Sequence, residues 1–117
     1  MSSEVLKQLA GISTATVTMQ LLKRGLRNCF IVGARPLNPR HSHFVAPAYT
    51  LPFIPMREDL SRVEVLGDPE YPARKAIEDI PPGMALVIDA RGEPGAGVIG
   101  DILTARLQER GVAAVVS

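Results

Sequence analysis

The chain has 117 residues, the size of one ordinary domain, and 46% of them are apolar, which is typical of a globular protein. Its net charge of about +1 and its five aromatic residues predict no nucleic-acid partner. No apolar run approaches the roughly 18 residues that cross a bilayer, so neither a membrane span nor a membrane partner is expected.

The N-terminal third predicts a cytoplasmic protein with two helices and a strand. Glu4 and Lys7 stand where a signal peptide needs an apolar core, and a lone Cys29 excludes an internal disulfide. Residues 3–11 form a short amphipathic pattern, and residues 13–25 predict a helix capped by Ser13. The apolar run 30–37 predicts a strand that enters a loop at Pro36, and we expect Cys29 beside it to be buried.

The middle of the chain predicts extended and surface structure. Residues 44–55 favour an extended conformation, and their three prolines confine it to an edge or an irregular strand. Residues 56–83 are charged and turn-rich, which predicts a surface segment with one short helix near residues 73–80.

The last third predicts a βαβ unit and therefore an α/β fold. Residues 84–90, "MALVIDA", indicate a strand buried on both faces. Four apolar residues then recur at helical spacing before Gly111, namely Ile99, Ile102, Leu103 and Leu107. Residues 112–116, "VAAVV", predict the second strand.

Gly95, Gly97 and Gly100 in this unit spell G-x-G-x-x-G, the outline of a dinucleotide-binding fingerprint. Four residues separate the strand from the first glycine, and Glu93 among them would repel a phosphate. We therefore disfavour dinucleotide binding. Two alternatives stay open: a plain flexible loop, or a helix start whose backbone N–H groups bind a small anion such as a carboxylate.

Other candidate residues have ordinary structural explanations beside functional ones. His41 and His43 could begin a metal site, but no further ligand is apparent and a solvated loop pair is the better interpretation. The adjacent carboxylates Glu58 and Asp59, like Glu78 and Asp79, are more typical of solvated surface.

The end of the first buried strand offers two further candidates. Asp89 could belong to a site or simply cap a loop. Arg91 could attract an anionic substrate.

Several segments together resemble the RraA-like family. They are "GISTATV", "GARPL", "PAYTL", "PPGMALVIDARG" and "GDILTARLQERGVAAVV". The family includes regulators of ribonuclease E activity and divalent-metal-dependent aldolases of 4-hydroxy-4-methyl-2-oxoglutarate. The resemblance implies one RraA-like domain over residues 1–117, with a swivelling β/β/α-type sandwich assembled as trimers or hexamers.

The resemblance also implies a site at the G-D-x-L turn. In the aldolases the turn's backbone holds the carboxylate and keto group of pyruvate, which maps onto Gly100, Asp101, Ile102 and Leu103. Asp101 would reach a Mg²⁺ or Mn²⁺ ion through water, as a second-sphere ligand. The family's substrate-binding arginine and direct metal ligand follow in an R-D pair, expected beyond Ser117 in a longer parent chain.

Two functions follow as expectations. The first is a metal-dependent lyase that cleaves or decarboxylates small 2-oxo acids to pyruvate, with its site incomplete in this chain, so that these 117 residues are expected to be inactive or poorly active. The second is a non-catalytic regulator that binds a ribonuclease E-like partner.

Overall fold

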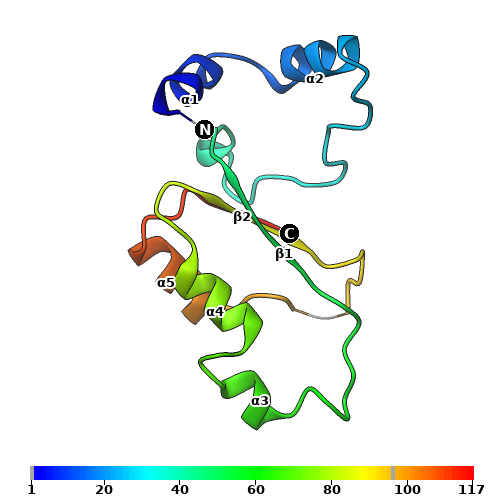
Figure 1. The fold of residues 1–117 in the computed structure, drawn as a ribbon, viewed down its shortest axis with the longest axis vertical. Coiled ribbons are helices and arrows are strands. Elements are labelled where there is room, and N and C mark those ends of the chain that lie inside the picture. The colour runs from blue at the N-terminus through cyan, green and yellow to red at the C-terminus, as the bar shows by residue number, and fades with distance from the viewer. Residues whose placement is uncertain (1, 96) are drawn as a thin grey trace. The chain divides into compact units, whose positions relative to one another are not determined.

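The computed structural model describes residues 2–95 and 97–117, apart from the side chain of His41. The chain divides into two compact units, Met1–Val45 (unit 1) and Ala46–Ser117 (unit 2), and each is described by itself (Figure 1). None of the described helices is long and apolar enough to cross a membrane.

Unit 1 contains the two helices that the sequence predicts. Helix α1 spans Ser3–Ala10 and α2 spans Thr14–Lys23, followed by a short 3-10 turn, η1, at Pro39–His41. Each helix begins at a serine cap because the hydroxyl accepts a hydrogen bond from a free backbone N–H of the first turn. Ser13 Oγ accepts from Thr16 N at 3.3 Å, as expected from its position in the sequence.

The predicted strand at residues 30–37 is wrong, because these residues form no strand in the structure. A strand needs a neighbour to satisfy its backbone, and no other segment pairs with this run among the described residues. Gly33 has a φ of 94° and Pro36 removes an N–H donor, so both interrupt an extended run. Cys29 beside it is exposed rather than buried.

Unit 2 is built on a small parallel sheet, which confirms the predicted α/β class. Strand β1 spans Ala48–Pro52, β2 spans Ala85–Asp89 and β3 spans Ala114–Val116, in the order β1-β2-β3. Leu86 on the central strand pairs with Tyr49 on one side and Val115 on the other. The proline-rich run thus forms an edge strand, as predicted, and β2–α5–β3 is the predicted βαβ unit.

Three helices complete the part of unit 2 that the structure describes. They are α3 (Val63–Gly67), α4 (Pro72–Asp79) and α5 (Asp101–Glu109). Helices α4 and α5 lie side by side and pack against the same face of the sheet (Figure 1). The sequence predicted α4 within one residue at each end, but not α3.

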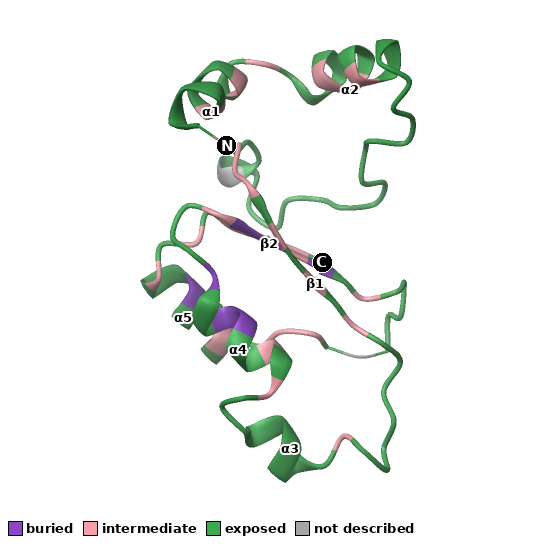
Figure 2. Ribbon diagram, in the orientation of Figure 1, coloured by how far each residue is buried: buried purple, intermediate pink, exposed green. Residues whose placement is uncertain are grey.

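The hydrophobic core lies between this helix pair and the sheet. It consists of five buried side chains from α4, its C-terminal cap, β2 and α5, namely Ile77, Ile80, Leu86, Ile88 and Leu107 (Figure 2). The expectation that residues 56–83 lie on the surface is therefore wrong for α4, whose inward face supplies part of the core. Apolar residues on one side of an otherwise charged helix are sufficient for this role.

Helix α5 turns two of its predicted apolar residues inward, and a third precedes it. Leu107 belongs to the core and Leu103 packs against it, while Ile99, just before the cap Gly100, is also packed against the core. Ile102 is 80% exposed, which contradicts the prediction that it shares this face. Because each residue turns a helix by about 100°, the row that contains Leu103 and Leu107 leaves Ile102 at its margin.

An ion cluster joins the outer surfaces of α4 and α5. Arg106 donates from Nε and Nη2 to the two carboxylate oxygens of Glu78, at 2.9 and 2.8 Å. Arg110 donates to the Ile80 carbonyl at 3.2 Å and lies 3.5 Å from Glu78. The hydrogen bonds from Arg106 lower the pKa of Glu78 below its usual value. The cluster therefore holds the two helices in register.

Glu78→Gln is expected to destabilise unit 2 slightly at neutral pH, and the difference from the native chain should vanish in acid. A carboxyl whose folded pKa is lowered contributes stability above its unfolded pKa, near 4.5, and loses it as pH falls through the folded pKa. Thermal melts between pH 7 and pH 3 measure this convergence. Glu64→Gln on α3 is the control, and an equal, pH-dependent loss there would contradict the role of the cluster.

Candidate functional site

The first turn of α5 carries the residues that the sequence singles out for substrate binding. Gly100 caps the helix in an extended conformation, and its carbonyl accepts from Thr104 N at 3.0 Å and from Thr104 Oγ1 at 2.8 Å. Gly100, Asp101 and Ile102 are exposed, while Leu103 packs into the core. Leu103 thus anchors the turn to the core, and the other three residues of the turn face solvent. Thr104 was not singled out in the sequence, although the G-D-x-L-T order could have suggested it.

The backbone donors of this turn are only partly used. Among the described residues, the N–H groups of Asp101 and Leu103 have no hydrogen-bond acceptor. Ile102 N donates at 2.9 Å to Asp101 Oδ1. Free N–H groups at a helix start, together with the helix dipole, favour a small anion.

Asp101 by itself does not make a metal site. In the part of the chain that the structure describes, no three His, Cys, Asp or Glu residues come close enough to hold a metal ion. Mg²⁺ prefers six oxygen ligands in octahedral geometry, and one carboxylate that already accepts from a backbone N–H supplies few of them. The described residues therefore do not fit a complete site for the metal.

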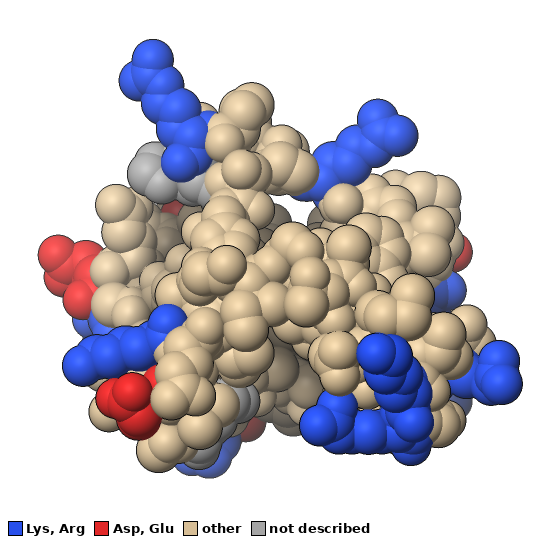
Figure 3. All heavy atoms as spheres, turned by 90° about the horizontal axis from the view of Figure 1, so that it is seen from above, with Lys and Arg blue, Asp and Glu red and all other residues tan. Residues whose placement is uncertain are grey.

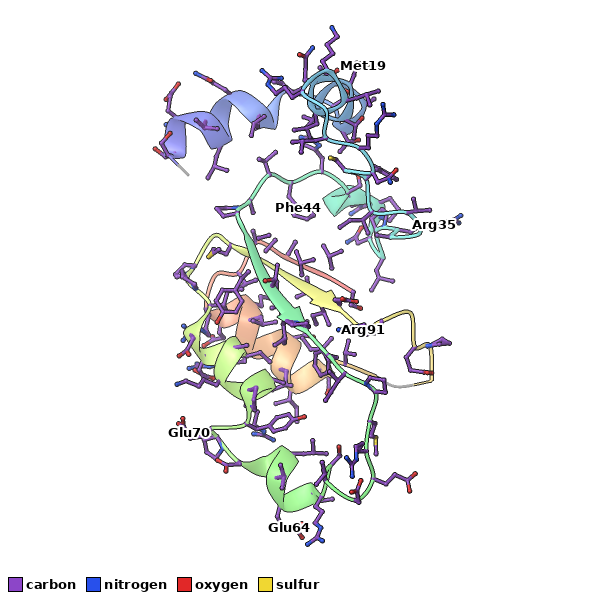
Figure 4. All side chains as sticks on the ribbon, turned by 45° about the vertical axis from the view of Figure 1, so that its right-hand side comes forward. Met19, Arg35, Phe44, Glu64, Glu70 and Arg91 are labelled. Carbon is purple, nitrogen blue, oxygen red and sulfur yellow. The ribbon has the colours of Figure 1, made fainter. Side chains whose placement is uncertain are left out.

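Asp89 and Arg91 form a turn at the carboxyl end of β2. Asp89 Oδ1 accepts from Arg91 N at 2.9 Å, and the two side chains form an ion pair at 3.7 Å. This geometry matches the loop-capping interpretation of Asp89 and explains how Arg91 keeps a φ of 58°. Both side chains are exposed, and Arg91 lies on the loop that leads from β2 toward α5 (Figure 4).

The glycine loop between β2 and α5 has no opening for a pyrophosphate at its first glycine. Gly95 N donates to Glu93 Oε1 at 2.8 Å, so a carboxylate already occupies this amide. A Cβ on Gly95 would lie 2.8 Å from the same oxygen, so a larger residue here would displace the flexible Glu93 side chain from this amide. The amide of the first glycine is thus satisfied within its own loop.

Several remaining candidates make hydrogen bonds or ion pairs on the surface. His43 donates from Nε2 to the Ala10 carbonyl at 2.7 Å, which ties the loop to α1, while the side chain of His41 lies outside the described residues. The adjacent carboxylates are exposed. Asp59 pairs with Arg57, which lowers the pKa of Asp59, and Asp79 pairs with Lys75 at 3.5 Å. Asp59, Glu78 and Asp79 are thus members of surface ion pairs.

The fold defines an α/β protein in which a helix with free N–H groups at its start follows the central strand. The family model described as "RraA-like: Aldolase/RraA" matches residues 11–117, and the chain belongs to this RraA-like family. Its members include aldolases and ribonuclease E inhibitors. No curated protein matches the chain.

The structure is similar to that of RraAS2 from Streptomyces coelicolor, described as an unusual member of the RNase ES inhibitor RraA protein family. The TM-score is 0.76 and the sequence identity 28%, over 98% of this chain and 52% of RraAS2. This chain therefore spans about half the length of that relative.

Proposed function

We propose that the chain carries the substrate-holding part of a lyase site for small 2-oxo acids, with the first turn of α5 binding the substrate carboxylate. The observation that supports this proposal is the pair of free N–H groups at Asp101 and Leu103 on an exposed helix start. A pyruvate-sized anion matches two such donors better than a dinucleotide does, because Glu93 occupies the amide of Gly95 in the preceding loop.

The turn would contribute orientation and charge stabilisation. Cleavage or decarboxylation of a 2-oxo acid develops an enolate, and donors already in place stabilise it without reorganisation. The N–H groups of Asp101 and Leu103 would fix the carboxylate, while the hydrogen bonds from Thr104 keep Gly100 in place. A bound Mg²⁺ or Mn²⁺ would supply Lewis acidity. Its direct ligand is proposed to come from outside these 117 residues.

A pair of substitutions at Asp101 tests the turn. Asp101→Asn removes the charge and keeps the N–H, whereas Asp101→Pro removes both. Proline is tolerated at the first helical position, and Gly100 before it is already extended. Backbone amide NMR shifts during titration with oxalate, a mimic of the enolate, should identify residues 101–103. We expect Asp101→Pro to bind oxalate about tenfold more weakly than Asp101→Asn.

Two results would contradict this proposal. The first is equal oxalate affinity in the two variants, or shifts confined to other residues. The second concerns the incomplete site: robust Mg²⁺-dependent release of pyruvate from oxaloacetate by this chain, abolished by Asp101→Ala, would mean that the 117 residues suffice for catalysis.

A regulatory function is the second candidate, favoured by the similarity to RraAS2 over nearly the whole chain. In this case the chain would bind a ribonuclease E-like enzyme without catalysis. Retention of such an enzyme on the immobilised chain, unaffected by Asp101→Pro, would favour it over the lyase. Cytoplasmic location and assembly as a trimer or hexamer are part of both proposals.

A further inference from the structure

The charges of the chain are segregated between its two units. Unit 1 holds six Lys and Arg residues and one Glu, a net charge of +5. Unit 2 holds seven Lys and Arg residues and eleven Asp and Glu residues, a net charge of −4. Between Glu4 and Glu58 there is no acidic residue. The near-neutral total, which predicts no polyanionic partner, therefore conceals a strongly basic N-terminal unit.

The cations of unit 1 differ from those of unit 2 in their partners. Five of the seven cations in unit 2 form ion pairs, at Arg57, Lys75, Arg91, Arg106 and Arg110. No cation of unit 1 forms an ion pair with any described residue, and all six are exposed. Their charge is thus available to an external anion. On the face of the molecule that Figure 3 draws, Lys and Arg side chains project into solvent, and fewer acidic side chains are visible.

Five of these cations fall within residues 23–40, here called the basic segment. It begins at the end of α2 and contains Lys23, Arg24, Arg27, Arg35 and Arg40. From Gly25 to Asn38 it has no helix or strand, and the backbone turns at Gly25, Asn28 and Gly33, where φ is positive. Phe30 lies among the arginines with 60% of its surface exposed.

We propose that the basic segment binds single-stranded RNA. Four of its five cations are arginines, whose planar guanidinium groups donate to phosphate oxygens in pairs and stack on bases. Irregular arginine-rich segments bind RNA by ordering around it, and an exposed aromatic ring offers a surface on which a base can stack. An anionic membrane is the less suitable partner, because the segment lacks the amphipathic helix that lies in a lipid interface.

Fluorescence anisotropy of the full chain with a labelled 20-nucleotide RNA tests the proposal. If all five cations contact phosphates, the affinity should fall about 100-fold between 50 and 200 mM KCl. Replacing Arg27, Arg35 and Arg40 by glutamine should weaken binding at least tenfold at 50 mM KCl and flatten the salt dependence. Phe30→Leu, which keeps an apolar side chain but removes the ring, should weaken binding by about fivefold or more.

The matched control replaces Arg57, Arg62 and Arg74 of unit 2 by glutamine, which changes the net charge equally. Circular dichroism establishes that each variant retains its helices. The proposal is supported if this control binds RNA nearly as tightly as the native chain while the triple variant of the basic segment loses affinity. It would be overturned by absence of RNA binding at 50 mM KCl, by equal losses in the two triple variants, or by tighter binding to phosphatidylserine vesicles than to RNA. The α5 turn takes no part, so the oxalate titration is a separate test.

Discussion

Leu107→Ala is expected to lower the free energy of unfolding of unit 2 by about 2–5 kcal/mol, as large-to-small changes in a packed core do. Leu107 is 1% exposed and lies on α5 in the cluster with Ile77, Ile80 and Leu86. Small domains are stabilised by only about 5–15 kcal/mol in total, so this loss is a large fraction of it. Urea unfolding followed by circular dichroism measures the change.

Ile102→Ala on the same helix is the matched control. Ile102 is 80% exposed, so its truncation should change the stability by less than about 0.5 kcal/mol. If Ile102→Ala proved as costly as Leu107→Ala, Ile102 would have to be buried, as the helical spacing in the sequence predicts. Should Leu107→Ala fail to fold, Leu107→Met keeps most of the volume and gives a measurable intermediate loss.

Gly111→Val is expected to cost about 1–3 kcal/mol, because a β-branched residue is strained at positive φ. Gly111 follows the end of α5 with a φ of 74° and redirects the chain into β3. Its carbonyl accepts from Gly83 N at 2.8 Å, so a shift at this turn also disturbs the start of β2. The same urea unfolding experiment measures the effect.

Ala113→Val two residues later serves as the comparison. Ala113 is exposed and adjoins β3, where a β-branched residue suits an extended backbone. We expect the free energy of unfolding of the Ala113→Val variant to stay within about 0.5 kcal/mol of that of the native chain. Equal losses at the two positions would show that crowding, and not the backbone conformation of Gly111, determines the cost.

The elements that could be predicted from the sequence are those with complete local signals. Ser13 as a cap, Gly111 as a stop and the continuous apolar run that ends before Asp89 each specify their structure within a few residues. The βαβ unit follows because its helix and two strands carry such signals in order. Its α/β class was therefore accessible without the structure.

The errors occur where the structure depends on partners distant in sequence. The run at residues 30–37 has the composition of a strand but no strand beside it among the described residues, and composition alone cannot reveal this. The burial of Ile77 and Ile80 was missed because two apolar residues within a charged segment are a weak pattern. Ile102 shows that spacing is ambiguous between adjacent positions of one helix.

For the candidate site, the turn could be located from the sequence. Which of its backbone N–H groups already have a hydrogen-bond acceptor could not. The helix start at Asp101 and its preceding glycine follow from local patterns. That Asp101 accepts from its neighbour's N–H, and that Glu93 occupies the amide of Gly95, depends on side-chain conformations that spacing does not specify. The segregation of charge, by contrast, can be read from the sequence, but the near-neutral net charge of the whole chain conceals it.

The proline at the end of β1 has a consequence for aggregation. Pro47 O accepts a hydrogen bond from β2, and Phe53 N donates one to β2. Because successive residues of a strand direct their backbone groups to opposite sides, the backbone groups of Ala48, Thr50 and Pro52 face away from β2. Pro52 has no N–H at this outer edge, and a strand from another molecule would meet a missing donor there. Uncontrolled strand addition, the first step toward amyloid-like stacking, is thus disfavoured at this side of the sheet.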